Sequence, residues 1–76
     1  MNEKLLELIQ NVLEDEGISV EITEESEFVD DLELSSLAFF NLITLVENTF
    51  DIKISDRELQ ELETVGDLAE IVDERA

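Results

Sequence analysis

The sequence predicts an all-α fold: a four-helix bundle with a short third helix and a long loop between the first and second helices. Three observations support this prediction. Apolar residues recur at helical spacing in separate segments, and a residue type that caps helices stands directly before each segment. The chain has 76 residues, which is enough for one small core. It has no proline, which argues against a linker or a second domain. We therefore expect residues 1–76 to form a single domain.

The first helix is expected over residues 3–16, with Asn2 as its N-cap and Gly17 as its stop signal. Its apolar stripe consists of Leu5, Leu8, Ile9, Val12 and Leu13. Residues 18–22 alternate in polarity over too short a stretch for a sheet. We interpret them as an extended connector that places Ile18, Val20 and Ile22 on the core.

Half of residues 23–34 are acidic, and the segment predicts a long loop held to the core by Phe28, Val29, Leu32 and Leu34. Loops of this length are often functional. The second helix is expected over residues 36–50. Steps of about 100° per residue put Phe39, Leu42, Ile43, Val46 and Phe50 on its inner face, with Phe40 at the margin and Leu37 and Leu45 on the polar side.

The third helix is short and ends near Leu62. Ser55 and Glu58 are spaced as a capping box, and Ile54 and Leu59 are placed to pack across it. Thr64 is expected to cap the last helix, with Asp67 at its third position. The inward residues of that helix are Val65, Leu68, Ile71 and Val72. Gly66 is expected to weaken this helix by about 1 kcal/mol relative to alanine.

Composition excludes several functions. The chain has 22 Asp and Glu, 4 Lys and Arg, and no His or Cys, so it lacks the usual general base, a thiol nucleophile and zinc ligands. We expect no enzyme, no catalytic residue and no dedicated metal site. The few scattered cations argue against nucleic acid, and no apolar run is long enough to cross a membrane. We expect a cytoplasmic monomer whose net charge of −18 favours basic partners.

Two hydroxyls stand where the long loop meets the second helix. Ser35 can serve as the N-cap, since serine is a preferred capping residue. Ser36 then occupies the first helical position, and its hydroxyl is left free and exposed. The residues on either side read Phe28-Val29-Asp30-Asp31-Leu32-Glu33-Leu34-Ser35-Ser36-Leu37.

This segment resembles the acyl carrier proteins, small acidic four-helix bundles in which Asp-Leu, three further residues and Ser-Leu precede the second helix. The resemblance continues in the segment that leaves the second helix, Phe50-Asp51 to Ile54, and at the start of the last helix, Thr64-Val65. It therefore covers nearly the whole chain. It implies that Ser36 carries covalent 4′-phosphopantetheine through a phosphodiester and holds acyl groups as thioesters. The implied setting is fatty-acid, lipid or polyketide biosynthesis.

The resemblance also implies two kinds of partner: a phosphopantetheinyl transferase, and acyl-transfer and chain-modifying enzymes with basic or apolar docking surfaces. The sequence departs from the family at Ser35, where members usually have Asp, which makes Ser35 a second candidate for attachment. Ala38, Asn41 and Asn48 are predicted on the exposed side of the second helix, where fatty-acid carriers tend to have carboxylates.

The expected partner surface combines exposed leucines with an acidic rim. Its members are Leu37, Leu45, Glu33, Glu47, Asp56 and Glu58. Two other functions stay open from the sequence. One is an aminoacyl or peptidyl carrier of a specialised pathway. The other is an acidic interaction module that bears no prosthetic group.

Overall fold

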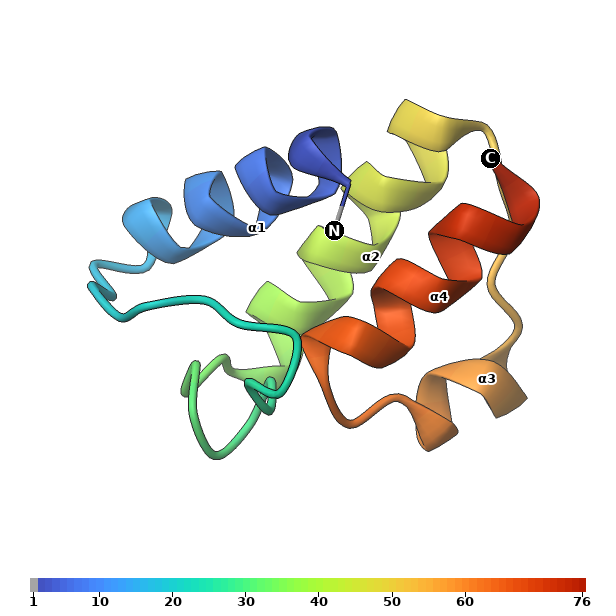
Figure 1. The fold of residues 1–76 in the computed structure, drawn as a ribbon. Helices are drawn as coiled ribbons and strands as arrows, with labels where there is room; N and C mark the ends of the chain where they lie inside the picture. Colours follow the sequence, from blue (N-terminus) through green and yellow to red (C-terminus); the bar gives the residue numbers. More distant parts are fainter. Residues whose placement is uncertain (1) are drawn as a thin grey trace.

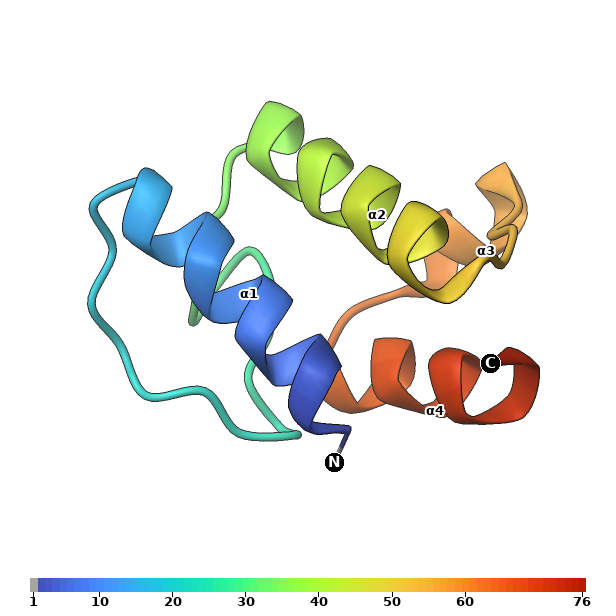
Figure 2. The ribbon, with the colours of Figure 1, turned by 90° about the horizontal axis from the view of Figure 1, so that it is seen from above.

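The computed structural model describes residues 2–76 and confirms the all-α fold. Its helices are α1 (Glu3–Asp15), α2 (Ser36–Phe50), α3 (Asp56–Glu61) and α4 (Val65–Arg75). A long loop joins α1 to α2, and the short α3 lies beside α4 (Figure 1). Seen from above, α1 and α2 lie side by side (Figure 2). None of the helices in residues 2–76 is long and apolar enough to cross a membrane.

The predicted capping residues define where the helices begin. Asn2, Ser35, Ser55 and Thr64 each accept a hydrogen bond from a backbone N–H of the first turn. Ser55 and Thr64 form complete capping boxes with Glu58 and Asp67. These bonds satisfy N–H groups that a helix leaves unpaired at its start, so local sequence determines the helix starts.

The core is built from the predicted apolar stripes, with three corrections. Val20 is exposed because the connector meets the core only through Ile18 and Ile22. Val29 is 74% exposed, because it follows the buried Phe28 within a turn that directs the two side chains apart. Ala38, expected on the exposed side of α2, is 3% exposed. It lies one turn before the buried Leu42, on the side of α2 that faces α1.

The long loop is held against the start of α4 by backbone hydrogen bonds. The N–H of Gly66 donates to the carbonyl of Glu24 at 2.8 Å, and the N–H of Val65 donates to the carbonyl of Ser26 at 2.9 Å. A Cβ atom at Gly66 would lie 2.9 Å from the same Glu24 oxygen. The glycine is unfavourable for the helix alone, but it permits this close approach of two backbones (Figure 1).

Helix α3 has no fully buried residue, so contacts outside its own sequence hold it in place. The guanidinium of Arg75, the last residue of α4, forms an ion pair with Glu58 and donates to the carbonyl of Lys53 at 2.7 Å. Hydrogen bonds from Arg75 and from the N–H of Ser55 hold the pKa of Glu58 at about 2, well below its ordinary value of 4.5. The link therefore contributes stability wherever Glu58 is ionised.

We expect Glu58→Gln to lower the melting temperature at pH 7 by more than Glu70→Gln does. Both variants remove one negative charge, but Glu70 takes part in none of the ion pairs or side-chain hydrogen bonds described within residues 2–76. The pKa of Glu58 is depressed in the folded state, so its contribution is complete above about pH 5 and disappears as the pH falls towards about 2. Thermal unfolding followed by circular dichroism across this range measures the difference. Equal melting temperatures at pH 7 would contradict a stabilising role for the ion pair.

Candidate functional site

The two serines at the loop–helix junction have different roles. The Oγ of Ser35 accepts a hydrogen bond from the N–H of Ala38 at 3.1 Å, which confirms Ser35 as the N-cap of α2. Ser36 is the first residue of α2 and is exposed. Within residues 2–76 its hydroxyl makes no described hydrogen bond to another residue. Of the two hydroxyls, only that of Ser36 is both accessible and uncommitted.

Glu33 adopts a left-handed backbone conformation three residues before Ser36, with φ of 54°. Its neighbours Leu32 and Leu34 are both buried, and their N–H groups donate to the carbonyls of Glu27 and Phe28. The turn therefore directs both leucines inward and leaves Glu33 exposed. A non-glycine residue in this conformation is strained by about 1 kcal/mol or more.

An apolar cavity of about 290 Å³ lies beside Ser36, between α2, α3 and the long loop. We call it the near cavity; its lining contains no charged side chain and consists of Phe28, Val29, Leu34, Ser35, Ser36, Phe39, Phe40, Ile43, Leu59 and Gln60. A free hydroxyl at the mouth of an apolar space fits a covalent arm that carries an apolar group.

A second cavity, of about 420 Å³, adjoins the near cavity. We call it the far cavity; it is lined by Glu27, Phe28, Val29, Phe39, Leu59, Leu62 and Glu63. The four residues common to both linings form the boundary between the two spaces: Phe28, Val29, Phe39 and Leu59. The far cavity does not reach Ser36, and it has carboxylates at its edge.

Two large apolar side chains lie exposed next to Ser36. Leu37 is 70% exposed and Phe40 is 60% exposed, and they are about 60° apart around the helix. The sequence placed Phe40 only at the margin of the core and did not assign it to the partner surface. Leu45 is less exposed and lines a groove against α1 that includes Val12. The structure therefore groups Leu37 with Phe40 and separates Leu45 from them.

The four predicted rim carboxylates differ in their availability. Glu33 and Asp56 are exposed. Glu47 is partly buried, and its Oε2 accepts a hydrogen bond from the N–H of Ile54 at 2.8 Å, which ties the end of α2 to the segment before α3. Glu58 is paired with Arg75. Glu47 and Glu58 thus have structural partners within the chain. The capping box of Glu58 with Ser55 was predicted, whereas the bond of Glu47 to Ile54 and the ion pair of Glu58 with Arg75 were not.

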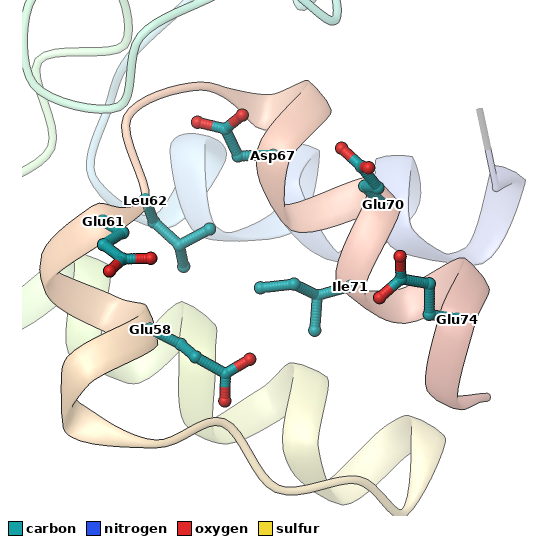
Figure 3. Close-up of a pocket in the computed structure, with 7 residues that line it drawn as sticks. All are labelled: Glu58, Glu61, Leu62, Asp67, Glu70, Ile71 and Glu74. Carbon is teal, nitrogen blue, oxygen red and sulfur yellow. The ribbon is translucent and has the colours of Figure 1, made fainter.

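A third cavity, of about 280 Å³, lies between α3 and α4 and shares no residue with the near cavity. Figure 3 shows Leu62 and Ile71 pointing towards each other between the helices, with five carboxylates around them: Glu58, Glu61, Asp67, Glu70 and Glu74. Among residues 2–76 no group of three or more Asp or Glu is arranged to hold a metal ion. This acidic side of α3 contrasts with its apolar side towards α2.

The fold is a small helical bundle in which the exposed Ser36 lies beside an apolar cavity. Residues 3–72 match the family described as "Phosphopantetheine attachment site". The chain is 39% identical over 74 residues to an acyl carrier protein of Coprothermobacter proteolyticus, covering 93% of this chain and 89% of that protein. It is 46% identical over 55 residues to an acyl carrier protein of Borreliella burgdorferi, covering 72% of this chain and 69% of that protein.

Solved structures show the same relationship. A candidate acyl carrier protein from Mycobacterium tuberculosis superposes with a TM-score of 0.83 at 41% identity, covering 93% of this chain and 92% of that one. The holo acyl carrier protein of Geobacter metallireducens superposes with a TM-score of 0.80 at 36% identity, covering 96% of this chain and 82% of that one. The chain belongs to the acyl carrier protein family and is an acyl carrier with covalent 4′-phosphopantetheine as its prosthetic group.

The strain at Glu33 predicts how substitutions there affect stability. We expect Glu33→Val to lower the free energy of unfolding by about 1–3 kcal/mol more than Glu33→Gly, because a β-branched residue is disfavoured at positive φ whereas glycine is not. Both variants remove the same charge, so the comparison isolates the backbone. Urea denaturation measures both values. Equal stability of the two variants would show that the left-handed conformation is not maintained in solution.

Proposed function

We propose that Ser36 is the attachment point of the 4′-phosphopantetheine group, and that the chain acts as a cytoplasmic carrier of apolar acyl groups without catalysing a reaction itself. The observation that carries this proposal is the division of roles between the two serines. Ser35 is committed to capping α2, while Ser36 offers a free hydroxyl at the edge of the near cavity.

When bound, the prosthetic group supplies the thiol that holds an acyl group as a thioester. The chain has no cysteine and cannot supply that thiol itself. Its own residues expose the Ser36 hydroxyl, keep the junction rigid through the Ser35 cap, and provide apolar walls beside it. These are the positioning functions that a protein contributes around a cofactor.

Two alternatives are weaker than an apolar acyl carrier. An aminoacyl or peptidyl carrier would hold polar cargo, whereas the near cavity has an apolar and aromatic lining. An unmodified acidic interaction module does not agree with membership of a family that carries covalent phosphopantetheine. The lining favours the apolar cargo of fatty-acid, lipid or related polyketide biosynthesis.

We expect coenzyme A and a broad-specificity phosphopantetheinyl transferase to add one phosphopantetheine to the wild type and to Ser35→Ala, and none to Ser36→Ala. Intact mass spectrometry detects the adduct. Ser35→Ala should lose about 0.5–2 kcal/mol of stability through loss of the cap, while Ser36→Ala should keep the helical spectrum. An adduct on Ser36→Ala that disappears in Ser35→Ala would move the site by one residue.

The side of α2 next to Ser36 is the proposed docking surface for the transferase and for acyl-handling enzymes. Leu37 and Phe40 supply exposed apolar area there, and the exposed Glu33 supplies a charge for basic side chains of the partner. Asp56 extends the acidic rim at the start of α3. Glu47 and Glu58, the other two predicted rim carboxylates, are engaged within the chain, so we expect them to contribute less to docking.

We expect Leu37→Ala to slow phosphopantetheinyl transfer by about fivefold or more, as expected when an apolar contact residue at an interface is truncated. Leu45→Ala removes the same atoms on the side facing α1 and serves as the matched control, with an effect of less than about twofold. Initial rates with the same transferase measure both. A wild-type rate for Leu37→Ala, or an equal loss in both variants, would remove Leu37 from the docking surface.

A further inference from the structure

We propose that the Phe28–Phe39 ring pair limits the length of the acyl chain that this protein can shelter, so that the carrier is suited to short and medium apolar chains. This inference rests on the proposed attachment at Ser36. It assigns Phe39 as the residue that determines chain-length specificity.

The ring pair lies at the boundary between the near and far cavities. Its ring centroids are 5.1 Å apart and its planes are inclined by 58°, within the range of favourable aromatic contacts. Both rings line both cavities, whereas Ser36 lines only the near one. An acyl chain attached at Ser36 therefore lies beside the near cavity and would have to pass the ring pair to reach the far one.

The two rings differ in burial. Phe28 is buried, its N–H donates to the carbonyl of Glu63 at 3.0 Å, and its carbonyl accepts from the N–H of Leu34 at 3.0 Å. Phe39 is only partly buried, on the first turn of α2. Substitution of Phe39 therefore opens the boundary with less disturbance to the core than substitution of Phe28.

The volumes set the approximate limit. An apolar cavity of about 150 Å³ holds benzene, with six carbons, so a space of about 290 Å³ holds about ten carbons of a flexible chain on the same scale. The far cavity would more than double this space. Its edge includes Glu27 and Glu63, and covering carboxylates with a methylene chain is unfavourable. Both features favour chains that end before the ring pair.

The test measures the melting temperature of the protein loaded with saturated acyl chains of about four to about sixteen carbons, relative to the holo form of the same variant. In the wild type we expect the melting temperature to rise by about 2 °C or more for each added pair of methylenes. The rise should stop near ten carbons, a chain length that we call the end point. In Phe39→Ala the rise should continue to longer chains. Phe50→Ala is the matched control, because Phe50 is also a partly buried phenylalanine of α2 but lines neither cavity, so its loss should leave the end point unchanged.

Phe39→Leu provides a second measurement if the alanine variant is too unstable, and should move the end point in the same direction by less. A wild-type rise that continues to sixteen carbons, no rise at any length, or the same end point in the wild type and the Phe39 variants would overturn the inference. The intact mass of the protein before acyl loading distinguishes a failure of this inference from a failure of the proposed attachment at Ser36. Absence of an adduct on Ser36 contradicts the attachment site, whereas a normal adduct with no end point contradicts only the role of Phe39.

Discussion

The close approach of the long loop to the first turn of α4 is the constraint on which the rest of the structure depends. The carbonyls of Glu24 and Ser26 accept from the N–H groups of Gly66 and Val65, groups that a helix leaves unpaired at its start. The same docking positions Phe28 through its bond to Glu63. Phe28 in turn forms a wall of both cavities, so backbone contacts at α4 determine the shape of the space beside Ser36.

Helix α3 separates two unlike environments. On its side towards α2 it contributes Leu59 to the apolar cavities, and on its side towards α4 it contributes Glu58 and Glu61 to an acidic groove. With a net charge of −18, carboxylates that face each other across this groove repel. Arg75 offsets part of this repulsion by pairing with Glu58. Together with the packing of Leu59 against the core, this ion pair holds a helix that has no fully buried residue.

Local sequence predicted the features that depend on neighbours in the chain. The caps at Ser35 and Thr64 and the apolar stripes could be predicted because the residues involved are three or four positions apart. The exposure of Val29 and the burial of Ala38 could not, because each depends on how a turn or a second helix meets the core. The commitment of Glu47 to Ile54 also required the tertiary path of the chain.

Helix α2 is the exception to a pattern among the four helices. The first turns of α1, α3 and α4 each contain an acidic side chain, while the first turn of α2 contains none. The partial positive charge at a helix N-terminus favours an anion. A phosphodiester on Ser36, the attachment we propose, would place a negative charge at the one helix start that lacks it. In a strongly acidic protein, conversion to the holo form would then add charge where the backbone dipoles can accommodate it, and the modification would stabilise the helix that bears it.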